Sequence, residues 1–123
     1  MLTTALNFNG KAEEAIDFYA NIFEYEIKDE DIHKWDNGLI AHAEIIIFDN
    51  KLMLADVDFD NDNFAGFSLA INLTDEDELK KIYDALSNGA DIIMPLQKVE
   101  WSECYGLLKD KFGVTWQLNL DYL

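Results

Sequence analysis

The chain has 123 residues, of which half are hydrophobic and 13% are aromatic, so its composition fits one ordinary globular domain with a sizeable core. Twenty-five Asp and Glu residues against nine Lys and Arg residues give a formal net charge of −16. Such a charge repels nucleic-acid phosphates and anionic membranes. The composition therefore excludes a disordered chain and argues against nucleic acid or a membrane as partners.

Three features predict the compartment. Cys104 is the only cysteine, so it can form neither an internal disulfide nor a thiolate zinc cluster, and we expect an inert, core-filling thiol in a reducing compartment. Residues 1–4 do not begin a basic segment followed by an apolar stretch, as a signal peptide would. No apolar run approaches the length of a membrane span. We expect a cytoplasmic protein.

The first half of the chain predicts one strand, one helix and three more strands. Residues 2–8 form the expected first strand, and apolar side chains recurring every three or four positions predict a helix over 11–23. Asp36-Asn37-Gly38 is a strong turn signal. The acidic run 56–63 is expected to connect the two halves, because it is too polar to bury. The further strands are expected at residues 25–33, 39–48 and 52–57, the last two joined across Asp49-Asn50.

The second half predicts the same order of elements. A strand over 67–73 leads into a helix over 75–87, with a capping box that begins at Thr74 and with Asn88-Gly89 at its end. Pro95 is expected to mark the edge or end of the next strand. The three later strands are expected at residues 90–94, 105–109 and 114–120.

The two halves therefore read as copies of one module. Leu6-Asn7-Phe8-Asn9 leads into the first helix and Ile71-Asn72-Leu73-Thr74 into the second, about half a chain length apart. Because each module has one helix to cover one face of its sheet, we predict an α+β fold in which two βαβββ modules leave a trough. A single domain over 1–123 is expected, with modules at about 1–60 and 64–123.

Two groups of residues could carry chemistry. His42 and Glu44 lie two positions apart on a predicted strand, so they share a face and could form a metal pair, an acid–base pair, or only a hydrogen bond. Residues 95–105 are expected to form a loop in which Trp101 and Tyr105 either line a small-molecule pocket or pack in the core. The sequence holds no GxGxxG, GxxxxGK[ST] or HExxH motif.

Three segments resemble a known family. They are FNGKAEEAIDFYANIF at 8–23, AHAEIIIFDNKLMLAD at 41–56, and a closing segment at 94–119 that ends in YG followed by D-x-FG-x-x-WQ. Together they resemble the PhnB-like branch of the vicinal oxygen chelate superfamily, the glyoxalase/bleomycin resistance fold, often labelled 3-demethylubiquinone-9 3-methyltransferase. The resemblance implies two βαβββ modules that form a U-shaped mixed-sheet cleft with helices on the outer face, in a homodimer.

The metal enzymes of this superfamily place one ligand on each of four strands. Their pattern falls on Thr4, Met53, Phe67 or Ser68, and Gln117 of this chain, of which Gln117 alone has the side chain of a metal ligand. The resemblance thus implies neither a bound metal nor another cofactor in this protein.

We expect first a binding module whose cleft holds a small aromatic or apolar molecule, neutral or cationic in view of the negative charge. The first alternative is a lyase-, isomerase- or dioxygenase-like enzyme that uses His42 as general base with Glu44 or Gln117, with or without a recruited divalent metal. A second alternative is a structural dimer with an empty cleft. The expected ligand-binding residues are Phe8, His42, Met53, Phe67, Trp101, Tyr105 and Gln117.

Overall fold

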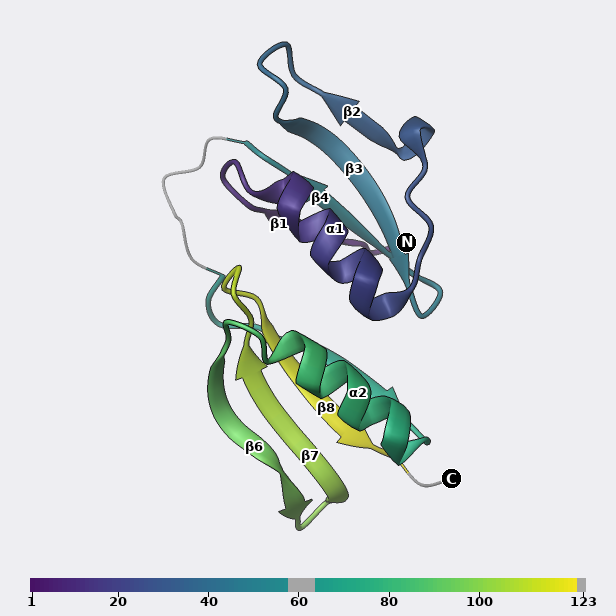
Figure 1. Cartoon of the computed structure of the whole chain (residues 1–123), viewed down its shortest axis with the longest axis vertical. Coiled ribbons are helices and arrows are strands. Elements are labelled where there is room, and N and C mark those ends of the chain that lie inside the picture. The colour runs from purple at the N-terminus through teal and green to yellow at the C-terminus, as the bar shows by residue number, and fades with distance from the viewer. Residues whose placement is uncertain (58–63, 122–123) are drawn as a thin grey trace. The chain divides into compact units, whose positions relative to one another are not determined.

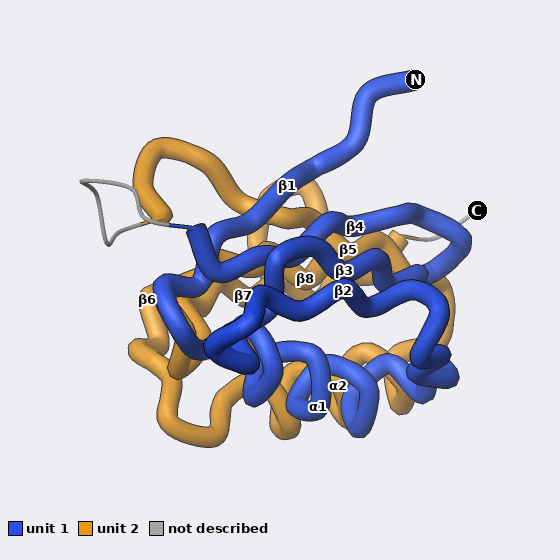
Figure 2. The backbone as a smooth tube through the Cα atoms, turned by 90° about the horizontal axis from the view of Figure 1, so that it is seen from above, with its two compact units in different colours: residues 1–62 blue, residues 63–123 orange. Residues whose placement is uncertain are grey.

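The computed structural model describes residues 1–57 and 64–121. The chain divides into two compact units, residues 1–62 and 63–123, which are coloured separately in Figure 2. Each unit carries one α-helix and one four-stranded mixed sheet, in the order βαβββ (Figure 1). The α+β class and the doubled module are therefore confirmed. No helix among the described residues is long and apolar enough to cross a membrane.

The first module is a sheet of order β1-β4-β3-β2 with one helix against it (Figure 1). β1 runs parallel to β4, so the first and last strands of the module are neighbours, while β3 pairs antiparallel with both β4 and β2. The elements are β1 (Thr4–Asn7), α1 (Ala12–Phe23), the short 3₁₀ turn η1 (Asp29–Asp31), β2 (Ile32–Lys34), β3 (Ile40–Ile47) and β4 (Asn50–Ala55).

The core of this module lies between α1 and one face of the sheet. Along β3 and β4 buried residues alternate with half-exposed ones, so Ala43, Ile45 and Leu54 face the helix while His42 and Met53 face the other way. From α1, the apolar stripe predicted from the sequence supplies the opposite wall. Its buried members are Ala12, Ala15, Ile16 and Tyr19.

Asp56 corrects the prediction that the acidic run is too polar to bury. It is 7% exposed, and its carboxylate accepts hydrogen bonds from the backbone N–H groups of Gly10, Ala12 and Ile40 at 2.7, 3.0 and 3.1 Å. The N-cap of α1, Lys11, makes no side-chain capping bond, so Asp56 satisfies the start of this helix from the far end of the module. Residues 58–63 of the predicted connection lie outside the described residues.

The second module repeats the plan with strand order β5-β8-β7-β6. β5 runs parallel to β8, again bringing the first and last strands together, and β7 pairs antiparallel with β8 and β6. The elements are β5 (Leu69–Leu73), α2 (Glu76–Leu86), β6 (Asp91–Val99), β7 (Ser102–Lys109) and β8 (Thr115–Leu120).

The buried residues of β8 and one glycine of β7 show which side of this sheet faces the helix. Trp116, Leu118 and Leu120 are buried along β8. On β7, a Cβ atom added to Gly106 would lie 3.0 Å from the ring of Tyr83 on α2, so a side chain at this position would clash with the helix. Glycine therefore lets α2 approach the sheet.

Several predicted boundaries were wrong. Residues 25–28 are not a strand, because the chain turns through η1 before β2 begins at Ile32. The N-cap of α2 is Asp75 rather than Thr74, and its carboxylate accepts from the N–H groups of Asp77 and Glu78. Of the two alternatives predicted for Pro95, it lies in an edge strand and does not end it, and the predicted 95–105 loop is instead the β6–β7 hairpin. β6 is an edge strand with shifted register, where a missing N–H costs no ladder bond.

Candidate functional site

The candidate site is the helix-free face of the second module, defined as the side of its sheet opposite α2. Gln117 projects onto this face because it alternates with the buried Trp116 and Leu118. Tyr105 and Leu107 project onto the same face because they flank Gly106, which faces the helix. The strand register pairs Leu107 with Gln117 and Tyr105 with Asn119.

A relay of uncharged polar groups crosses this face. The Tyr105 hydroxyl donates a hydrogen bond to Gln117 Oε1 at 2.8 Å, and Gln117 Nε2 donates to Ser68 Oγ at 2.7 Å. Tyr105 is only 9% exposed, so its ring is held in one position. The relay fixes the Gln117 amide from both ends and therefore presents a rigid set of neutral donors and acceptors.

Trp101 lies beside this relay. It occupies the β6–β7 turn, is 66% exposed, and packs edge-on against Tyr105 with ring centroids 5.4 Å apart. An exposed indole held by a second ring offers apolar surface to a ligand with little loss of side-chain freedom. Of the predicted 95–105 segment, Tyr105 contacts Gln117 directly and Trp101 contacts Tyr105, and both belong to a hairpin rather than to a loop.

The other predicted ligand-binding residues lie on other segments of the chain. Phe67 precedes β5 and is 46% exposed, next to Ser68 in sequence. Met53 lies on the helix-free face of the first module, opposite Glu44 on β3. Phe8 is buried in the first module's core against Tyr19, with ring centroids 6.4 Å apart. Phe8 is therefore not part of the candidate site.

The first module brings His42 and Glu44 together on its helix-free face. His42 Nε2 lies 3.4 Å from Glu44 Oε1, and Lys51 Nζ lies 3.4 Å from Glu44 Oε2. The hydrogen bond with His42, followed by the one with Lys51, lowers the pKa of Glu44 from its ordinary value. Glu44 is thus an anion that orients the imidazole ring of His42.

Sequence reasoning missed a second histidine at this position. His33 is the register partner of His42 across β2 and β3, and the two rings lie 6.4 Å apart. The predicted strand 25–33 includes His33, but its position opposite His42 depends on the register between β2 and β3, which the local sequence does not give. No group of three or more His, Cys, Asp or Glu side chains within residues 1–57 and 64–121 is placed to hold a metal ion.

The superfamily's ligand positions do not fit a divalent ion in this chain. Thr4 pairs with the buried Leu52 in the parallel register, so it faces α1, and the neighbouring Ala5 shares the face of Met53. A thioether and an alanine methyl group do not bind a hard cation, and the single amide oxygen of Gln117 accepts from Tyr105. These side chains therefore support no metal-assisted step.

Cys104 is buried on β7, opposite to the face that carries Tyr105. Burial, followed by the nearby charge of Glu76, raises the pKa of its thiol. A buried thiol with a raised pKa is a poor nucleophile.

Comparisons with known proteins identify the family of the chain. The family model described as 3-demethylubiquinone-9 3-methyltransferase matches residues 1–119. The chain belongs to this family. Its resemblance to the PhnB-like branch of the vicinal oxygen chelate superfamily is thereby confirmed.

Three relatives illustrate the range of similarity. The solved structure of the PhnB protein from Bacillus cereus is 33% identical, has a TM-score of 0.87, and covers 98% of each chain. Protein YjdN of Escherichia coli K12 is 32% identical over 82 residues, which make up 66% of this chain and 56% of YjdN. A glyoxalase/bleomycin resistance protein/dioxygenase family enzyme from Burkholderia phytofirmans shares the fold alone, at 12% identity and a TM-score of 0.68, with 97% and 94% of the two chains covered.

The family's description implies a methyl donor, whose nucleoside part would need a binding loop. The turn between β1 and α1 holds a single glycine, Gly10, whose N–H is bonded to Asp56. The turn before α2 has none, and Asp75 caps that helix. The described residues thus hold no glycine-rich loop before either helix, and the residues at these turns do not fit such a donor.

Proposed function

We propose that this PhnB-like protein binds a small, partly aromatic molecule on the helix-free face of its second module, which forms a wall of a small-molecule-binding cleft. The observation that carries the proposal is the hydrogen-bonded series Tyr105, Gln117 and Ser68 beside the exposed ring of Trp101. A few fixed polar groups next to apolar surface are the usual composition of a ligand site.

The chemistry of this face favours neutral or cationic ligands. The relay contains no charged group, so it offers hydrogen bonds without a counter-ion for a carboxylate or phosphate. The chain's net charge of −16 further disfavours anions. Trp101 can stack on an aromatic ring or contact a cation through its π face.

A fluorescence titration tests the proposal. Trp116 is buried and Trp101 is exposed, so a ligand on this face should quench Trp101. We expect naphthalene-2-carboxamide and 2-naphthylmethylammonium to quench the emission, and naphthalene-2-carboxylate to do so much more weakly. Trp101→Phe should remove the signal, whereas Trp35→Phe should keep it.

Binding should also depend on the relay. Tyr105→Phe removes the hydroxyl that fixes the Gln117 amide, so a ligand must then order this side chain, and a cost of about 1 kcal/mol corresponds to roughly fivefold weaker binding. If no aromatic probe quenches Trp101, or if Trp101→Ala and Tyr105→Phe bind as tightly as the unmodified protein, the proposed site is wrong.

The His42–Glu44 pair supports an enzyme as the second candidate function. Its 3.4 Å contact leaves His42 with a partly exposed ring oriented by a carboxylate, which is the arrangement of a general base. The proposal predicts turnover of a model substrate of the superfamily's reaction types, such as a hemithioacetal or a catechol, in protein purified without an affinity tag. Turnover should be lost in His42→Ala. Absence of turnover with and without added Mn²⁺ would exclude these reactions.

A further inference from the structure

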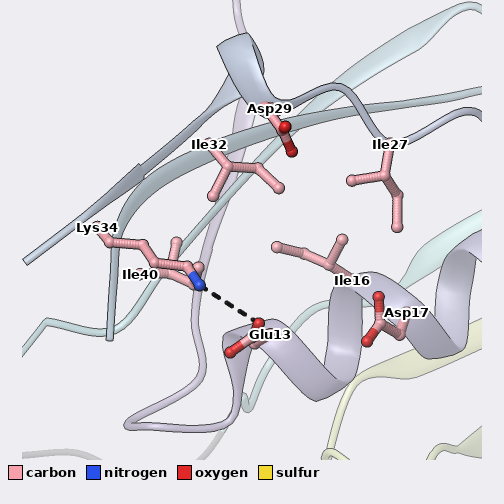
Figure 3. Close-up of a pocket in the computed structure, with 8 residues that line it drawn as sticks. All are labelled: Glu13, Ile16, Asp17, Ile27, Asp29, Ile32, Lys34 and Ile40. Atoms are coloured by element: carbon pink, nitrogen blue, oxygen red, sulfur yellow. Dashed lines mark hydrogen bonds and ion pairs between the residues drawn. The ribbon is translucent and has the colours of Figure 1, made fainter. Parts of the chain in front are cut away.

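A pocket of about 310 Å³ lies in the first module, between α1 and the segment that runs through η1 into β2 (Figure 3). This volume reaches the lower end of the range for small-molecule sites. The pocket lies on the α1 side of the first module's sheet, opposite to the face that carries His42. Its lining residues are Glu13, Ile16, Asp17, Ile27, Asp29, Ile32, Lys34 and Ile40.

Four isoleucines make the interior of the pocket apolar. Ile16 and Ile40 are 2% and 1% exposed and form part of the core, whereas Ile27 is 40% exposed. Figure 3 shows Ile16, Ile27 and Ile32 around the same space. Hydrocarbon that entered this pocket would cover apolar surface of Ile27 and Ile32 that water now contacts.

The charged residues at the rim are unequally paired. Lys34 Nζ lies 3.4 Å from Glu13 Oε1, so those two charges compensate each other (Figure 3). Asp17, one helical turn after Glu13, and Asp29 form no ion pair with any residue in the described ranges. The rim therefore keeps an excess of negative charge above an apolar interior.

The wall that carries Ile27 is held in place before any ligand binds. The Tyr25 hydroxyl donates a hydrogen bond to the Ile16 carbonyl oxygen, and the N–H of Asp31 donates to the carbonyl oxygen of Lys28 at 3.0 Å. Burial, followed by the charge of Asp17, raises the pKa of Tyr25, so its hydroxyl keeps the proton it donates. A preformed pocket does not have to be ordered by its ligand.

We propose that this pocket binds a small organic ammonium ion, with its hydrocarbon part among the isoleucines and its ammonium group at the Asp17 and Asp29 carboxylates. Charge complementarity selects the cation, and the apolar lining selects a ligand with a hydrocarbon body over a simple metal ion. The ligand class follows from the pocket alone and does not depend on the binding proposed for the second module.

Calorimetric titration of the full chain with 2-phenylethylammonium tests the proposal, with 2-phenylethanol and 3-phenylpropanoate as neutral and anionic counterparts. We expect the ammonium ion to bind more tightly than the alcohol, no binding of the carboxylate, and weaker ammonium binding at high salt. In protein with ¹³C-labelled isoleucine methyl groups, the shifted signals should be those of Ile16, Ile27 and Ile32.

Variants separate the rim from general electrostatics. Asp17→Asn and Asp29→Asn should each weaken ammonium binding by about fivefold, the effect of one partly exposed charge pair. Glu14→Gln, which removes the same charge from an exposed position on α1 outside the lining, should leave the affinity unchanged. Lys34→Met should tighten binding, because it leaves Glu13 without its partner.

The proposal is overturned if the ammonium ion does not bind, if the alcohol binds equally well, or if the methyl shifts map to other residues. It is likewise overturned if Glu14→Gln weakens binding as much as the two rim variants do. The shifts of the Ile16, Ile27 and Ile32 methyl signals should be the same in Trp101→Ala, so this readout separates the pocket from the site proposed in the second module.

Discussion

The Asp110 carboxylate accepts a hydrogen bond from the indole Nε1 of Trp116 at 2.8 Å, and both residues are buried in the second module. The other carboxylate oxygen accepts from the N–H groups of Phe112 and Val114 at 2.9 and 3.1 Å. The D-x-FG-x-x-WQ segment is thus a structural unit that closes the β7–β8 hairpin. The Asp110 carboxylate holds Trp116 on the side of β8 that faces the helix. Gln117, the next residue of the strand, therefore points to the helix-free face.

Asp110→Ala should therefore destabilise the protein strongly. The substitution leaves two backbone N–H groups and one indole N–H without their acceptor, and each buried unpaired group costs about 1–3 kcal/mol, so we expect a loss of about 3 kcal/mol or more. Urea unfolding measures this change in the free energy of unfolding. Asp91→Ala, which removes the same charge from an exposed strand position, is the control, and equal stability of the two variants would refute the role of the carboxylate.

Asp56→Ala should have a comparable effect in the first module. Gly10, Ala12 and Ile40 lose the acceptor of their N–H groups, so we expect a destabilisation of about 3 kcal/mol. Amide hydrogen exchange gives a specific readout, because the N–H groups of Ala12 and Ile40 should exchange much faster. Asp36→Ala, at an exposed turn, should leave both rates unchanged.

The lowered pKa of Glu44 predicts a pH dependence of stability. A carboxyl group whose pKa is lower in the folded than in the unfolded protein stabilises the fold at pH values above its unfolded pKa. This contribution is lost as the pH falls through the folded pKa. In NMR titrations of the side-chain carboxyl, His42→Ala should raise the pKa of Glu44 more than Lys51→Met does, because the His42 hydrogen bond is the larger cause. An unchanged pKa in His42→Ala would mean that the pair does not form.

The order of elements was predictable because hydrophobic periodicity is a local signal. The apolar stripes predicted the positions of both helices. The alternation along β8 predicted that Gln117 faces away from the core. The end of the strand predicted at 90–94 was wrong because Pro95 does not interrupt β6. A proline is tolerated within a strand at the edge of a sheet, and the local sequence does not show which strand lies at the edge.

Contacts between two residues of one strand could be predicted from the sequence. Contacts between residues of different strands could not, because they depend on strand pairing and register. Alternation alone placed His42 beside Glu44. The contact of Tyr105 with Gln117 depends on the β7–β8 register, and that of Gln117 with Ser68 on the parallel pairing of β5 with β8. The burial of Asp56 was not predicted, because the N–H groups that it binds come from three separate positions of the chain. The number of charges in its own segment gives no information about those positions.

The location of Asp56 has a consequence for synthesis on the ribosome. A nascent polypeptide emerges amino end first, and Asp56 follows β4, the strand that β1 must find. All three N–H groups that bind Asp56 belong to earlier residues of the same module, so these hydrogen bonds need no residue of the second module. Every group that they require has therefore been synthesised before the second module is translated.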